Sequence, residues 1–179
     1  MGFMLTSCGE SVKDGIINDV NEYFTSAEAE LAEIDNVEDF LIFVEVMNDR
    51  TDLLDLLQEK YGEKTISEED QQAVEEYIYD RATAYNKAES ARCTEFLTPA
   101  IERLEAIVNQ MYPMFQAGTA FDQETLDEFV DAYTAVTDFS VCENVDSALV
   151  ERLDPTFTME DEMSETIIAR LDEIYPDEE

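Results

Sequence analysis

Apolar side chains recur every three or four residues along most of this chain, and no other feature of the sequence constrains the fold as strongly. The first stretch, residues 11–34, shows the spacing most regularly, at Val12, Ile16, Val20, Phe24, Ala27, Leu31 and Ile34. This spacing places apolar side chains on one face of an α-helix. Only five glycines and four prolines interrupt the 179 residues, which favours long helices over many short strands.

Capping residues predict where the next helices begin and end. Asn36 precedes an apolar pattern over residues 37–61, and its side chain can accept a hydrogen bond from a first-turn N–H group. Ser67 and Asp70 form a variant of the capping box at the start of the following helix. Gly62 stands just past the second helix, where a residue with positive φ commonly ends a helix.

Prolines predict further boundaries. Thr98 and Pro99 have the order of an N-cap and a first helical residue, which predicts that a new helix begins there. Pro113 lacks a backbone donor, so this helix is expected to end or kink nearby. A short helix is expected over residues 146–153, before the next proline, and the last helix is expected to begin after Thr158.

Asp122 marks the clearest of the later helix starts. Phe121 before it and Leu126 four positions into the helix match a hydrophobic staple, in which two apolar side chains fix how the chain enters the helix. The segment before this start closes at Gly118. The pattern therefore predicts a separate amphipathic helix after Asp122.

Together these segments predict an all-α protein, an antiparallel bundle of about five to seven amphipathic helices. A single helical domain is expected over residues 11–175, because no linker is long enough to separate two domains. Residues 1–10 are interpreted as a truncated signal and tether, and residues 176–179 as an acidic tail.

The charge of the chain limits its partners. Forty-five Asp and Glu residues face ten Lys and Arg residues, which gives a net charge of −35. Such a field repels nucleic-acid phosphates and anionic lipid headgroups, so neither is an expected partner. Cations are expected to bind loosely and to screen the repulsion. A basic protein is the macromolecular partner that this charge favours.

The residues that most enzymes use are missing. The chain has no histidine, the commonest general base and transition-metal ligand. It also lacks a P-loop, a dinucleotide fingerprint, a nucleophile elbow and an EF-hand loop. We therefore predict no catalytic residue, no cofactor and no metal site, and the sequence favours a protein that is not an enzyme.

A short motif near the N-terminus suggests a location. Leu5, Thr6, Ser7 and Cys8 form an aliphatic residue, two small residues and a cysteine, followed by a short polar stretch. This motif resembles the lipobox of bacterial lipoproteins, and in particular those of Bacteroidetes. The resemblance implies that Cys8 is lipidated and that the chain is anchored at the outer membrane or the periplasmic face of the envelope. The four residues carry no lysine- or arginine-rich segment before them, and without export the location would be cytoplasmic.

Two further cysteines, Cys93 and Cys142, leave two alternatives open. In an oxidising compartment they form an even pair, and a disulfide between them would close a long loop and stabilise the fold by about 3–4 kcal/mol. Two buried thiols in helices agree with the sequence equally well.

These observations lead to three functional hypotheses. The first is a non-catalytic cell-envelope lipoprotein domain that serves as a binding or spacer module for an unknown partner. The second is an acidic immunity-type or inhibitor protein that binds a basic partner, for which Tyr79 or Tyr112 would be exposed contact residues. The third is a hydrolase of envelope or glycan material that works through carboxylates, which requires a pocket with two carboxylates and a raised pKa on one of them.

Overall fold

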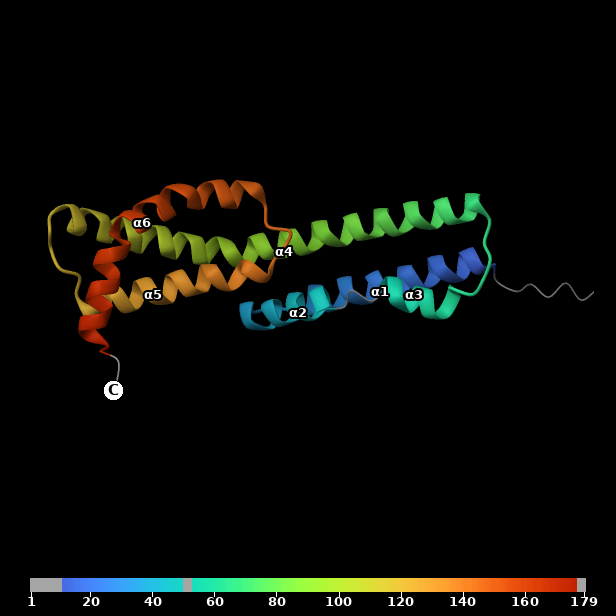
Figure 1. Ribbon diagram of the computed structural model, residues 1–179, viewed down its shortest axis with the longest axis horizontal. Coiled ribbons are helices and arrows are strands. Elements are labelled where there is room, and N and C mark those ends of the chain that lie inside the picture. Colours follow the sequence, from blue (N-terminus) through green and yellow to red (C-terminus); the bar gives the residue numbers. More distant parts are fainter. Residues whose placement is uncertain (1–10, 50–52, 177–179) are drawn as a thin grey trace, which may run out of the picture. The chain divides into compact units, whose positions relative to one another are not determined.

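The computed structural model describes residues 11–49 and 53–176 (Figure 1). Cys8, with the rest of the lipobox, and the last three residues of the acidic tail lie outside these ranges. The described residues form helices and no strand, which confirms the all-α prediction. The helices are α1 (Val12–Glu33), α2 (Val37–Asp49), α3 (Leu53–Tyr61), α4 (Glu68–Gln116), α5 (Gln123–Thr137), the 3₁₀-helix η1 (Asp138–Val141) and α6 (Ser147–Ile174).

The predicted helix starts that rest on capping side chains are confirmed. The Asn36 side chain accepts a hydrogen bond from the backbone N–H of Asp39 at 2.9 Å. The Ser67 hydroxyl accepts one from the N–H of Asp70 at 3.1 Å and donates to the Asp70 carboxylate at 2.8 Å. Asp122 caps α5 in the same way, and the two staple residues beside it are buried. Short-range capping bonds of this kind can be read from sequence because both partners lie within four residues.

The helix boundary predicted at Thr98 and Pro99 is wrong. α4 runs without a break through Pro99 and also through Pro113. The Thr98 hydroxyl donates to the carbonyl of Thr94 at 2.6 Å, one turn back, and does not cap a new helix. A proline inside a helix costs about 3 kcal/mol. An unbroken row of buried side chains outweighs that cost here, at Leu97, Ile101, Leu104, Val108 and Met111.

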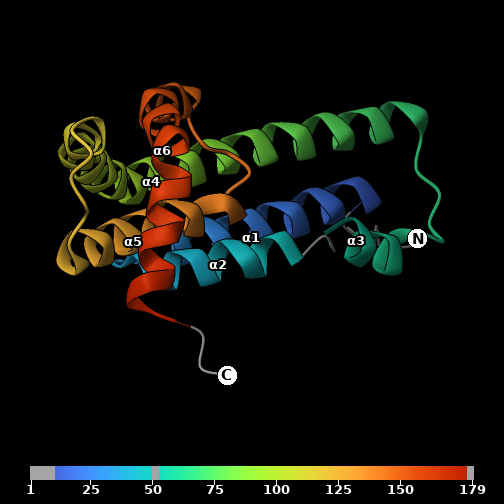
Figure 2. The ribbon, with the colours of Figure 1, turned by 60° about the vertical axis from the view of Figure 1, so that its left-hand side comes forward.

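The separate helices predicted over residues 146–153 and after Thr158 are also wrong, because both belong to α6. The Thr158 hydroxyl donates to the carbonyl of Asp154 at 2.9 Å and so bonds within the helix. Pro155 lies inside α6, and the helix changes direction along its length in Figures 1 and 2. Buried residues on both sides of Pro155 hold the helix against its neighbours.

The helix predicted over residues 37–61 is found as two helices, α2 and α3. Gly62 also differs from its prediction. Among the described residues Gly118 has a positive φ, of 64°, and Gly62 does not. The N–H of Gly62 instead donates to the backbone carbonyl of Gln58 at 2.7 Å. A Cβ atom at position 62 would lie only 2.3 Å from this carbonyl oxygen, which explains the glycine.

The helices gather into two compact units, residues 1–89 and 90–179, and α4 contributes to both. In the first unit α1 and the first part of α4 run parallel, as two ion pairs show: Lys13 pairs with Asp70, and Glu28, further along α1, pairs with Arg81, further along α4. α2 and α3 run back in the opposite direction alongside α1 (Figures 1 and 2). The buried apolar residues of this unit include Ile16, Val20, Phe24, Ala27, Leu31, Phe40, Val44, Val74 and Tyr85.

The second unit repeats the same up-down-up order. The later part of α4 runs up, α5 returns, and α6 runs parallel to α4, with Arg152 bound to Glu105 at 2.7 Å and Tyr112 to Glu162 at 2.6 Å. Its buried residues include Leu104, Met111, Phe121, Leu126, Phe129 and Met163. The prediction of one domain over residues 11–175 stays a prediction.

Candidate functional site

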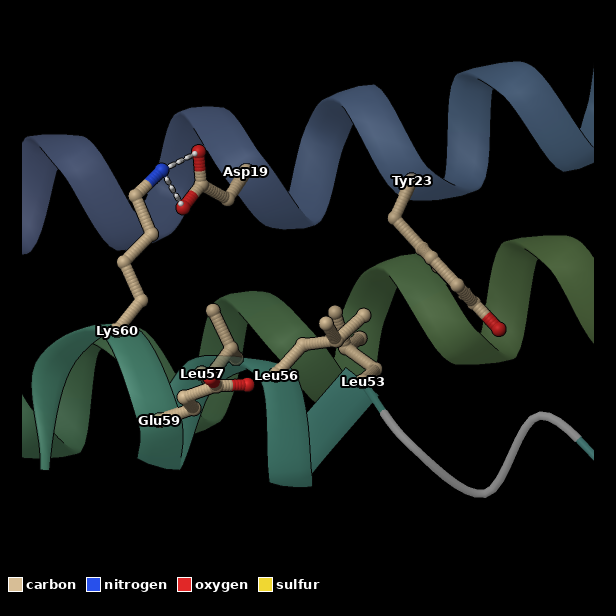
Figure 3. Close-up of a pocket in the computed structure, with 7 residues that line it drawn as sticks. All are labelled: Asp19, Tyr23, Leu53, Leu56, Leu57, Glu59 and Lys60. Atoms are coloured by element: carbon tan, nitrogen blue, oxygen red, sulfur yellow. Dashed lines mark hydrogen bonds and ion pairs between the residues drawn. The ribbon is translucent and has the colours of Figure 1, made fainter.

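A groove lies between α1 and α3 in the first unit (Figure 3). It has a volume of about 510 Å³, which lies in the range of about 300–1,000 Å³ usual for ligand sites. Its lining combines apolar side chains with three charged ones, and consists of Asp19, Tyr23, Leu53, Leu56, Leu57, Glu59 and Lys60. We call it the α1–α3 groove.

An ion pair closes one end of this groove. The Lys60 ammonium donates to both carboxylate oxygens of Asp19, at 2.8 and 2.6 Å, as Figure 3 shows. The Tyr61 hydroxyl donates to the same carboxylate at 2.7 Å. We call these three residues the Asp19 clasp. Gly15 leaves room for it, because a Cβ at this position would lie 2.9 Å from the Tyr61 hydroxyl oxygen.

The protonation of the clasp does not suit acid–base or nucleophilic chemistry. The hydrogen bond from Lys60 holds the pKa of the Asp19 carboxyl below its ordinary value. The same bond raises the pKa of Lys60, while burial and the carboxylate raise the pKa of Tyr61. A catalytic lysine or tyrosine needs a lowered pKa and a catalytic acid a raised one, so every shift here runs the wrong way. The clasp connects α3 to α1, and the three leucines provide the apolar surface that a ligand in the groove could contact.

Sequence reasoning did not find the clasp. Asp19 is separated from Lys60 and Tyr61 by more than forty positions. In the apolar pattern, Tyr61 counts only as part of a helix face. One signal was present: Gly15 weakens an otherwise regular amphipathic helix, and an interior glycine often marks a close approach.

A second groove lies between α1 and α2 in the same unit, with a volume of about 360 Å³. We call it the α1–α2 groove. Ile42, Phe43 and Val46 provide apolar surface, and Glu30, Glu33 and Asp39 provide carboxylates; Ile34 completes the lining. Among the described residues no lysine or arginine pairs with these three carboxylates.

A third groove, of about 430 Å³, lies in the second unit between Phe121 and α6. Its one cation, Arg170, donates to the Phe121 carbonyl at 3.1 Å and also binds Glu173. The guanidinium is therefore committed to contacts within the fold. Ala120, Glu165, Thr166 and Ala169 complete the lining.

Each of these three grooves contains at least two carboxylates, so the hydrolase hypothesis depends on a raised pKa at one of them. In the part of the chain that the structure describes, burial raises the pKa of Glu160, and repulsion from Asp161 raises it further. Glu160 lines none of the three. Among the described residues no group of three or more carboxylates or thiols is placed to hold a metal ion.

The predicted site residues that the structure describes lie apart from these grooves. Cys93 in α4 and Cys142 after η1 are buried, 1% and 7% exposed, and the disulfide between them stays a prediction. Tyr79 is 72% exposed, as the inhibitor hypothesis requires, whereas Tyr112 is half-buried and bonded to Glu162. Cys8 lies outside the described residues.

The chain has no match among protein families, curated proteins or solved structures. Within the described residues, no helix combines the length and the apolar character needed to cross a membrane. What the grooves can bind is therefore inferred from their own lining residues.

Proposed function

We propose that this chain is the folded part of a bacterial cell-envelope lipoprotein, anchored through Cys8, and that it works as a non-catalytic binding module for a basic protein. One observation carries the binding role. Five large apolar side chains of α2 and α3 are exposed, at Val37, Ile42, Val46, Leu54 and Leu56, and the same two helices are rich in carboxylates. Exposed apolar groups with a polar rim are typical of protein-binding surfaces.

The use of the basic residues supports a basic partner. Lys13, Lys60, Arg81, Arg92, Arg103, Arg152 and Arg170 each pair with a carboxylate of the same chain. The remaining carboxylates greatly outnumber the remaining cations, so the field that reaches a partner is negative. The acidic inhibitor hypothesis is a special case of this proposal, in which the basic partner is a toxin or nuclease and Tyr79 is a contact residue.

Two experiments test the two halves of the proposal. The gene is expressed with about twenty upstream codons, enough for a signal peptide, and cells are fed a labelled fatty acid. We expect lipid on the wild-type chain and none on Cys8→Ala; equal labelling of both would refute the anchor.

For the binding half, a photo-crosslinking residue replaces Leu56 on the apolar surface or Tyr79 away from it, in living cells. A binding module forms a discrete adduct from Leu56 with a protein of high isoelectric point. A spacer gives no adduct, and an acidic partner would refute the charge argument. An adduct from Tyr79 alone would favour the inhibitor hypothesis.

A further inference from the structure

The α1–α2 groove differs from the α1–α3 groove in one respect that bears on its partner. In the α1–α3 groove the carboxylate of Asp19 is neutralised by Lys60. In the α1–α2 groove the carboxylates of Glu30, Glu33 and Asp39 have no cation of the described chain beside them. The described part of α1 and α2 is strongly acidic, because residues 11–49 contain eleven acidic residues and a single lysine.

The apolar part of this groove is exposed. Ile42 is 53% and Val46 is 43% exposed, and Phe43 is half-buried beside them. Together with Asp39 they stand at positions i, i+3, i+4 and i+7 of one helix, so they form one stripe along about two turns of α2. A stripe of this spacing is the usual complement of an amphipathic segment laid along a groove.

Other occupants fit poorly. Phosphates and anionic lipids are repelled by the carboxylates. A second copy of this chain carries the same charge of −35 and would add repulsion. A buried small molecule would need more enclosure than side chains that are half exposed provide.

We infer that the α1–α2 groove binds a cationic amphipathic segment of the partner protein, with apolar side chains on Ile42 and Val46 and lysine or arginine beside Glu30, Glu33 and Asp39. This inference rests on the proposed function and names the surface and the chemistry of the partner. Asp39, which lines the groove, accepts a hydrogen bond from the Asn36 side chain at 2.7 Å through one carboxylate oxygen. Bonds from lysine or arginine to such carboxylates are charge-assisted and short.

The test uses the full chain and a fluorescent helical peptide of leucine and lysine, about four turns long, in an anisotropy titration. Glu30→Gln with Glu33→Gln is expected to weaken binding about three- to tenfold, since two partly exposed ion pairs are lost. The matched control, Glu124→Gln with Glu128→Gln on α5, removes the same charge from exposed positions that do not line the groove. It is expected to change affinity less than about twofold, because carboxylates that do not contact the bound segment are screened by salt.

The apolar half of the inference has its own pair of variants. Ile42→Ser is expected to weaken binding about three- to tenfold, because an exposed apolar contact is lost. Ile168→Ser on α6, at a residue 59% exposed that does not line this groove, is the control. Both changes lie at exposed positions, and circular dichroism checks that both variants fold.

Each outcome decides the matter. Equal weakening by the two charge pairs would mean diffuse attraction to an acidic surface and would overturn the inference, as would an unchanged affinity of Ile42→Ser. In both cases the peptide still binds, so the proposed basic partner would survive. If the wild-type chain binds neither this peptide nor an arginine version, the groove assignment and the basic partner both fail.

Discussion

Replacing Gly15 with alanine tests the packing of the Asp19 clasp. Glycine inside a helix is about 0.8–1.0 kcal/mol less favourable than alanine, so the helix alone predicts that Gly15→Ala stabilises the protein. The structure predicts otherwise, because the added Cβ would lie 2.9 Å from the Tyr61 hydroxyl. That hydroxyl must then move, and it gives up its 2.7 Å hydrogen bond to the Asp19 carboxylate.

The magnitude follows from these two opposing effects. A hydrogen bond to a charged group contributes about 1.5–3 kcal/mol, and a partly solvated one lies at the low end. We therefore expect Gly15→Ala to be neutral or to destabilise by up to about 1 kcal/mol. In a Tyr61→Phe background no oxygen opposes the Cβ, and the same change should stabilise by about 1 kcal/mol.

Urea unfolding followed by circular dichroism at neutral pH measures all four proteins of this double-mutant cycle. The expected coupling between the two positions is about 1–2 kcal/mol. Stabilisation by about 1 kcal/mol in both backgrounds would refute the reasoning, because it would mean that the hydroxyl of Tyr61 does not oppose a Cβ at position 15.

Four further predictions follow from the fold and its charges. The pKa of Asp19 is lower in the folded protein than its ordinary value of 3.8, so the ionised carboxylate stabilises the fold at pH values above 3.8. This stabilisation is lost as the pH falls through the folded-state pKa. Urea midpoints should therefore fall less steeply on acidification in Asp19→Asn than in the wild type. Pro99→Ala should stabilise by about 1–3 kcal/mol in urea unfolding because α4 is continuous there, whereas a loss would indicate that a helix begins at this residue. In a Cys8→Ala background, Cys93 and Cys142 should react slowly with iodoacetamide in the native protein and give two adducts by mass in guanidinium without reductant; a protein that stays unlabelled in guanidinium would be bridged. Sodium chloride or magnesium chloride should raise the melting temperature, since the chain carries a charge of −35, and a flat or falling temperature would contradict self-repulsion as a cost to folding.

Much of the architecture could be predicted from the sequence because its causes are local. An apolar side chain every three or four residues defines a helix face, and a cap such as Asn36 or Ser67 bonds to an N–H group three residues away. Where the predictions failed, at Pro99 and Thr158, local signals competed with tertiary packing. The burial of continuous apolar faces on α4 and α6 outweighed the cost of the prolines.

Some properties of the candidate site likewise follow from the sequence alone, and others depend on the tertiary structure. Its acidic character and its lack of histidine are properties of composition, so the sequence alone predicts that nucleic acid is an unfavourable partner and shows that the commonest general base is missing. Only the tertiary structure decided which carboxylates are neutralised. Asp19 meets Lys60 across forty-one positions, while Glu30 and Glu33 meet no cation of the described chain. The net charge follows from composition alone. Which carboxylates pair with a cation depends on which helices pack side by side, and the three- and four-residue spacing of apolar side chains does not specify that.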